Sequence, residues 1–175
     1  MSPESHNDAE TLLAQIGRAP RPPWRVFARC EAGFPQAIVS PSELADGTPF
    51  PNYAWLTCPW LVEECSAEES GGATAAWATR AAEDVELADS LIALDAAVRA
   101  ARASESGGFD LCEGVGVAGQ RSPLGVKCLH AHVALALVGL CDPIGSDVLS
   151  RTGTMCSDTR CARLVPRCAQ TGKDE

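Results

Sequence analysis

The stretch Lys127-Cys-Leu-His-Ala-His132 holds the densest group of chemically reactive side chains in this sequence. Two of the chain's three histidines lie here, within five residues of a cysteine and on an otherwise apolar segment. If residues 126–140 form one helix, Cys128 and His132 are four residues apart and share a face. His130 then points elsewhere, at about 200° from Cys128, unless it lies in an unwound first turn.

Cys30 and Cys58 each end a candidate strand just before a turn. Side chains at such strand ends have a fixed backbone and can converge on one cleft. Three cysteines and one histidine form a common tetrahedral zinc environment, and thiolates also bind iron–sulfur clusters. We therefore predict a metal site, with zinc as the first choice and an iron–sulfur cluster as the alternative, formed by Cys30, Cys58, Cys128 and His132.

This metal site has two possible roles, and a metal-free enzyme is the rival interpretation. If the protein fills all four positions, the site is structural or regulatory; if one is open, a bound water can be activated for hydrolysis, with His130 as proton carrier. In the metal-free enzyme, Cys128 is the nucleophile and His130 or His132 is its base. Lys127 and the glycine-rich loop 114–125 then form an anion site.

The other cysteines have simpler interpretations. Cys65 and Cys112 have no ligand partners nearby in the sequence, Cys141 closes the predicted apolar helix, and all three are expected to be packing residues. Three lie in a polar, basic C-terminal segment and are expected to be solvated thiols, namely Cys156, Cys161 and Cys168. The pattern Gly114-Val-Gly-Val-Ala-Gly119 lacks the preceding strand and following helix of a dinucleotide site, so no cofactor site is predicted there.

The elements that position these residues indicate an α+β fold, with a small N-terminal antiparallel sheet packed by three or four helices. Strands are predicted where apolar runs lie between glycine and proline turns, at residues 24–30, 36–40 and 52–58. Helices are predicted from a proline start at Pro59 to Glu69, and from periodic leucines or continuous apolar character over 74–103 and 126–140. The helix predicted over 74–103 consists of two helices if a new helix starts near Asp84.

Composition suggests three regions. Residues 1–23 form a flexible N-terminal segment, residues 24–150 form a single α+β domain with the Cys/His cluster, and residues 151–175 form a basic, cysteine-containing tail expected to be disordered. With 175 residues, one domain of ordinary size is expected, large enough to fold without disulfides.

Charge limits the classes of partner. Acidic residues outnumber basic ones by 23 to 14, and this net charge of −9 disfavours general binding to nucleic acid or to anionic membranes. Residues 61–110 carry 11 acidic residues and three arginines, or −8 of that charge. Such helices expose a solvated acidic face, or, in an interaction module, meet a basic protein partner.

Cysteine chemistry depends on the compartment, and the sequence favours the cytoplasm. The first residues lack the basic start and the continuous apolar stretch of a signal peptide. The longest apolar run, from Cys128 to Cys141, has 14 residues and is too short to span a bilayer. We therefore expect a cytoplasmic protein with reduced thiols.

The chain also resembles the uncharacterised bacterial family catalogued as domain of unknown function 501. The resemblance covers roughly Trp24 to Leu149 and rests on motifs that occur in the family's order: Arg29-Cys30 with Gly33 and Pro35, Asp46-Gly-Thr-Pro-Phe-Pro51, Trp55-Leu-Thr-Cys-Pro59, Gly114-Val-Gly116, Val126-Lys-Cys-Leu-His-Ala-His132 and Asp142-Pro-Ile-Gly145. Asp142 stands where the family usually has asparagine, and Ala32 stands where it commonly has a second cysteine. Five predicted residues fall inside these motifs: Cys30, Cys58, Cys128, His130 and His132. The family carries no established activity, so the resemblance implies positions and not a mechanism.

Overall fold

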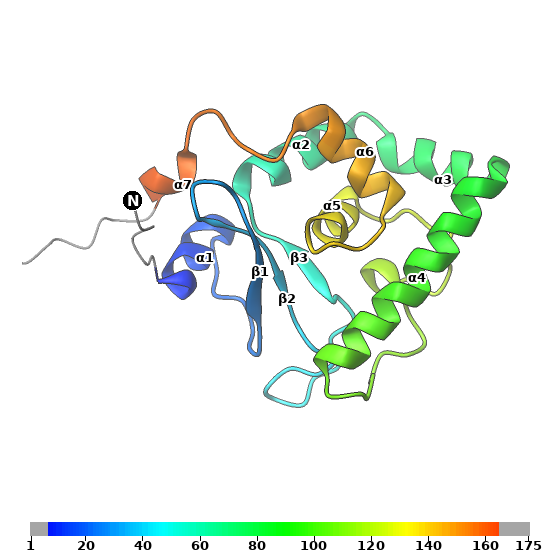
Figure 1. The fold of residues 1–175 in the computed structure, drawn as a ribbon, viewed down its shortest axis with the longest axis horizontal. Helices are drawn as coiled ribbons and strands as arrows, with labels where there is room; N and C mark the ends of the chain where they lie inside the picture. The colour runs from blue at the N-terminus through cyan, green and yellow to red at the C-terminus, as the bar shows by residue number, and fades with distance from the viewer. Residues whose placement is uncertain (1–6, 165–175) are drawn as a thin grey trace, which may run out of the picture.

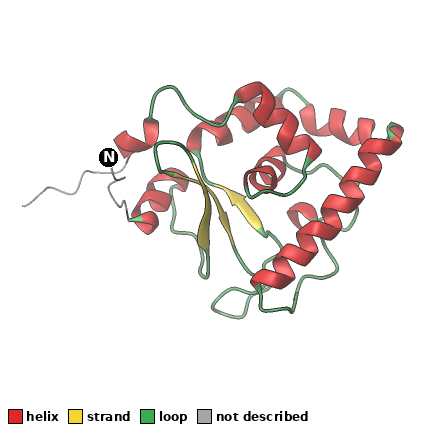
Figure 2. Ribbon diagram, viewed as in Figure 1, coloured by secondary structure: helices red, strands yellow, loops and turns green. Residues whose placement is uncertain are grey.

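A computed structural model describes residues 7–164 and shows an α+β fold, as predicted. The three strands form one antiparallel sheet in the order β1-β2-β3, with β1 at Arg25–Arg29, β2 at Pro35–Val39 and β3 at Ala54–Leu56. All three lie within the predicted ranges or differ from them by one residue. Figure 2 shows the small sheet beside a larger helical part. Every residue of β2 is buried, because it has a strand on either side and helices against it.

Three helices follow β3 and form the acidic part of the chain. Their bounds are Pro59–Ser70 for α2, Ala73–Glu83 for α3 and Val85–Glu105 for α4. Pro59 is the first residue of α2, a position where its missing N–H costs no hydrogen bond. Asp84 separates α3 from α4 and accepts a hydrogen bond from the backbone N–H of Leu87, at 3.1 Å. The predicted break at this aspartate is therefore confirmed.

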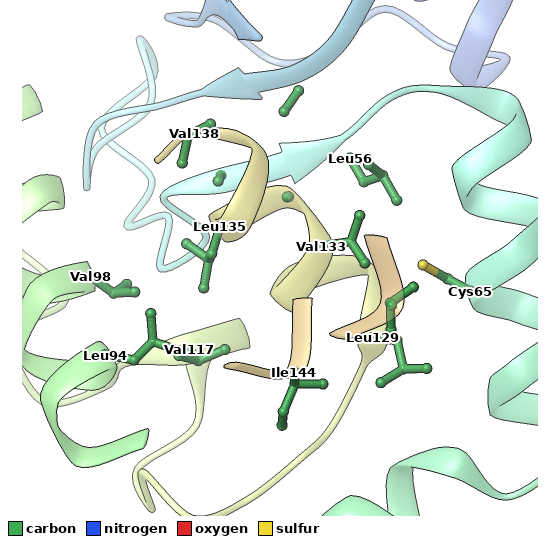
Figure 3. Close-up of a cluster of buried hydrophobic side chains, with 14 of the residues drawn as sticks. Leu56, Cys65, Leu94, Val98, Val117, Leu129, Val133, Leu135, Val138 and Ile144 are labelled. Atoms are coloured by element: carbon green, nitrogen blue, oxygen red, sulfur yellow. The ribbon is translucent and has the colours of Figure 1, made fainter. Parts of the chain in front are cut away.

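The helix α5 (Leu129–Leu137) lies at the centre of the molecule, between the sheet and the other helices (Figure 1). It contacts β2, β3, α2, α6 and the short 3-10 turn η1 (Val117–Gly119). Figure 3 shows Val133 on the side of Leu56 and Leu135 on the side of Val98. The helix is thus buried by different neighbours on different sides, which explains why its sequence is apolar all round.

Three more helices complete the described part of the fold. α6 (Pro143–Thr152) was not predicted, and it begins at Pro143 because Asp142 caps it and proline suits its first position. α1 (Asp8–Ile16) packs against β2 and α7 (Arg160–Leu164). Residues 153–164, expected in a disordered tail, therefore return to the sheet, whereas residues 165–175 with Cys168 lie outside the described residues. Within residues 7–164, no helix has the length and apolar character needed to cross a membrane.

The side chain of Arg102 joins α4 to two loops near the sheet. It is fully buried, pairs with Asp110 at 2.8 Å and donates to the carbonyl oxygens of Pro51, Cys112 and Val115, each at 2.7 Å. Burial disfavours ionisation of Asp110, but the guanidinium and the N–H of Cys112 lower the pKa of its carboxyl overall. The loop that leads to η1 and then to α5 is therefore held by one guanidinium.

Replacing this guanidinium should destabilise the protein strongly. Arg102→Met leaves a buried carboxylate and three carbonyl groups without their donor, which should lower the free energy of unfolding by about 3–5 kcal/mol. Arg25→Met is the matched control, because the ion pair of Arg25 with Glu105 is half-exposed and should contribute about 0–1 kcal/mol. Urea denaturation followed by circular dichroism measures both, and similar losses for the two variants would contradict this account.

Candidate metal centre

A compact group of donor side chains lies where α5 begins and α2 ends. Cys128 is the N-cap residue of α5 and has an extended backbone, with φ of −161° and ψ of 122°. The helix α5 therefore begins at Leu129, and Cys128 itself is not helical. Because Cys128 lies outside the helix, it approaches His130 and not His132, which is two residues further on and on another side of the helix. The sequence allowed this approach if His130 lay in an unwound first turn, but in the structure His130 is helical and Cys128 is the residue outside the helix.

Three different donor atoms meet at this point. The Cys128 Sγ lies 3.4 Å from His130 Nδ1, and the same nitrogen lies 3.0 Å from Glu69 Oε1. Among the described residues, these three form the one group of Cys, His, Asp or Glu side chains whose ligand atoms all lie within 4.8 Å of one another. All three are partly exposed, so an ion from solvent can reach them.

The hydrogen-bond network assigns the proton of the His130 ring. Nε2 lies 3.2 Å from the carbonyl oxygen of Val62 and 3.2 Å from Ser66 Oγ. The Ser66 hydroxyl donates its own hydrogen to the same carbonyl, at 2.8 Å. Both neighbours of Nε2 are thus acceptors, so Nε2 carries the ring proton. In the neutral ring, Nδ1 is left with a lone pair that points at Glu69 and Cys128.

His130 Nδ1 carries either a proton or a metal ion in this arrangement. A bare nitrogen lone pair and a carboxylate oxygen repel each other at 3.0 Å, and a proton donated from Nδ1 to Glu69 or a bound ion removes that repulsion. In the absence of a metal, the Cys128 sulfur and then the Glu69 carboxylate raise the pKa of His130 to about 9, although burial opposes the rise.

Glu69 has a second role at the same place. Its Oε1 accepts a hydrogen bond from the backbone N–H of Leu129, at 2.6 Å. A carboxylate is favourable here, because the first N–H groups of a helix lack partners and its N-terminus carries a partial positive charge. The interaction fixes the Glu69 carboxylate beside His130 whether or not an ion is bound.

The group opens into a cleft of about 190 Å³ beside β3. Cys128 and His130 line the cleft together with Lys127, which is exposed and was predicted to belong to an anion site. The remaining lining residues are Asn52, Ala54, Trp55, Leu56, Ala118 and Ala131. A small molecule in this cleft therefore lies next to Cys128, His130 and Lys127, whereas Glu69 is not among the lining residues.

The four ligands predicted from the sequence are divided among three places. Cys128 lies in the group just described, while Cys30 and Cys58 line another pocket beside the β1–β2 turn. Cys58 precedes α2 and Glu69 lies in its last turn, so the helix separates these two places by roughly 16 Å, at 1.5 Å per residue. An ion held by Glu69, Cys128 and His130 is thus too far away to be held by Cys58.

His132 lies in the core between α5 and α6. Its Nδ1 is 2.8 Å from Asp142 Oδ2, and its buried Nε2 has no hydrogen-bond partner among residues 7–164. Asp142 Oδ1 accepts from the N–H groups of Ile144 and Gly145, at 3.0 and 2.9 Å. This one carboxylate therefore starts α6 and orients His132, which gives His132 a structural role.

Glu69 is the member of this group that sequence analysis missed. It is one of four glutamates in α2 and lies 59 residues before Cys128, with no motif around it. The sequence signal that could have located it is indirect, because it is only an acidic residue at the end of a predicted helix.

Asp142 offers a test of the core arrangement. Asp142→Ala removes the cap of α6 and leaves the His132 ring unpaired, so the free energy of unfolding should fall by about 2–4 kcal/mol. Asp142→Asn keeps an acceptor for the helix and a polar partner for the ring, and should lose about 1 kcal/mol. Urea denaturation compares the two variants, and an alanine variant as stable as the asparagine variant would contradict the role of Asp142.

Comparison with protein families supports the resemblance noted in the sequence. No significant match is found among curated proteins or among solved structures. The family model described as "Protein of unknown function (DUF501)" matches residues 26–150, which include all of the sheet except Arg25, together with Glu69, Cys128 and His130. The chain therefore belongs to this DUF501 family of unknown function.

Proposed function

We propose that this protein binds a zinc ion through Glu69, Cys128 and His130, and that the ion keeps one position open towards the cleft. The observation that carries this proposal is the convergence of three ligand atoms, because His130 Nδ1 lies 3.0 Å from Glu69 Oε1 and 3.4 Å from Cys128 Sγ. Oxygen, sulfur and nitrogen donors in one site suit zinc.

The spacing of the donor atoms fits such an ion. Zinc bonds of about 2.0–2.3 Å at tetrahedral angles place neighbouring ligand atoms roughly 3.4–3.6 Å apart. The Sγ–Nδ1 separation of 3.4 Å matches this, and the Nδ1–Oε1 separation of 3.0 Å needs only a small outward shift. Few rearrangements are therefore needed to form the site.

The number of ligands and the cleft indicate the kind of chemistry. Zinc sites with three protein ligands and a water are typical of hydrolytic enzymes, because the metal lowers the pKa of that water. Lys127 adds a positive charge to the same cleft. The proposed activity is hydrolysis of a small, negatively charged substrate, with the anionic group held near Lys127.

Metal content tests the site directly. Untagged protein should contain zinc, and Cys128→Ser, His130→Asn and Glu69→Gln should each lose one equivalent of it, since each variant removes one donor atom. Cys141→Ser is the matched control, because Cys141 lies outside the site and is exposed, contrary to the packing role predicted for it. After exchange with cobalt, the sulfur-to-cobalt charge-transfer absorption of the wild type should be weaker in Cys128→Ser. Unchanged metal content in all three ligand variants would contradict the proposal.

The open position is tested with a small anion. Azide should change the visible spectrum of the cobalt-substituted protein by taking the fourth position. Lys127→Met should weaken azide binding about fivefold, which corresponds to about 1 kcal/mol, while the metal content stays the same. No spectral change at high azide concentration would mean that the protein fills every position.

A proton in place of the metal gives a second candidate function, a thiol enzyme. The observation that favours it is the contact of 3.4 Å between Cys128 Sγ and His130 Nδ1, by which His130 can take the thiol proton. Glu69 contacts the same nitrogen, and its carboxylate would stabilise the positive charge that the ring gains with this proton. Metal-free purified protein, with Cys128 alkylated by iodoacetamide far faster than Cys141 and slowed by His130→Asn, would support this function instead of zinc binding.

A further inference from the structure

A second group of thiols lies near the start of α2, at the other end from Glu69. Four cysteines from three parts of the chain line one small pocket beside the β1–β2 turn: Cys30, Cys58, Cys156 and Cys161. We refer to it as the four-cysteine pocket. The last two come from the C-terminal segment, which leaves α6 and returns to α1 and the β1–β2 turn (Figure 1).

The size of the four-cysteine pocket suits a single ion. It encloses about 10 Å³, which is roughly the space that one water molecule needs. An organic ligand or a four-iron cluster is much larger than this. Cys58 and Cys161 are buried, and Cys30 and Cys156 are half-buried, so the sulfurs lie in a largely apolar place with limited access to water.

The thiols of this pocket influence one another. Burial raises the pKa values of Cys58 and Cys161, and the sulfurs of Cys30 and Cys156 raise both further. Their negative charges would therefore repel one another in the pocket, and a divalent cation removes that repulsion when it binds the thiolates.

Several neighbouring groups already favour negatively charged sulfur. The N–H groups of Trp60 and Leu61, at the positive end of α2, oppose the rise in the pKa of Cys58. The side-chain amide of Gln15 donates a hydrogen bond to Cys161 Sγ, at 3.3 Å. Such N–H donors offset part of the excess negative charge of an ion with four thiolates.

We propose that the four-cysteine pocket binds one zinc ion, which joins the C-terminal segment to the sheet. Each thiol gives up its proton as its sulfur bonds to the metal, so four protons are released for each ion bound. This is a structural site, because four protein ligands leave no position for water. It goes beyond the proposed function, which concerns a different ion at the other end of α2.

Binding includes a local movement. In residues 7–164, no three of these sulfurs all lie within 4.8 Å of one another, in contrast to the donor atoms of Glu69, Cys128 and His130. The segment that carries Cys156 and Cys161 must therefore move towards Cys30 and Cys58 when the ion binds. Thr159 has a left-handed backbone, with φ of 45°, and forms the turn by which Cys156 and Cys161 both reach the pocket.

Metal stoichiometry with paired variants tests this proposal. Reduced, metal-free full-length protein is titrated with cobalt, and two equivalents should bind to the wild type and to Cys141→Ser. Cys128→Ser should lose one equivalent and keep a spectrum with strong sulfur-to-cobalt absorption from four thiolates. Cys156→Ser should lose the other equivalent. Cys156 is half-buried in a loop, so this variant should keep its fold.

Proteolysis supplies an independent measurement. Trypsin cleavage after Arg160 and Arg163 should become about tenfold slower when zinc is added to the Cys128→Ser protein, and zinc should have no effect in Cys128→Ser/Cys156→Ser.

A Cys156→Ser protein that still binds two equivalents of cobalt overturns the proposal. Two other results also overturn it. The wild type could bind a single equivalent of cobalt that is lost in Cys128→Ser, or the cysteines of the four-cysteine pocket could form disulfides in the purified protein without metal. A chain that binds only the four-cysteine equivalent would refute the proposed function and leave this inference standing.

Discussion

The burial of α5 is the constraint on which the rest of the structure depends. No residue of this helix is exposed, and it contacts the sheet, α2, α6 and η1. A buried helix must still satisfy its first N–H groups, since they have no partner within the helix. Here Glu69 at the end of α2 accepts from Leu129. The same requirement that stabilises the helix start therefore places a carboxylate beside Cys128 and His130.

Much of the fold could be predicted because it depends on local signals. Glycine and proline turns located all three strands, Pro59 located the start of α2, and Asp84 located the break between α3 and α4. The prediction failed to extend to α6, where Asp142 and Pro143 are a helix start that follows another helix closely. Residues 153–164 were also expected to be disordered, because the packing of α7 against α1 is a long-range contact that composition does not reveal.

The candidate site was predictable only in part. Cys128 and His130 stand two residues apart and could be chosen from the sequence, but Glu69 depends on how α2 packs against α5. The expected set of Cys30, Cys58, Cys128 and His132 assumed that both strand ends open towards α5. Instead α2 begins at one cysteine site and ends at the other, so its length keeps the two apart. His132 faces the core because it lies one turn beyond the capped start of its helix.

The distribution of the thiols through the structure has a practical consequence. Cys65 is fully buried in the core, and burial raises its pKa to about 12, whereas Cys141 is exposed. A small alkylating reagent added to the native protein will label Cys141 at once, but it can reach Cys65 only while α2 and α5 are apart. The rate at which Cys65 is labelled therefore reports how often the core opens, and the labelling of Cys141 is the internal reference. Mass spectrometry of the labelled peptides measures both rates without an engineered cysteine.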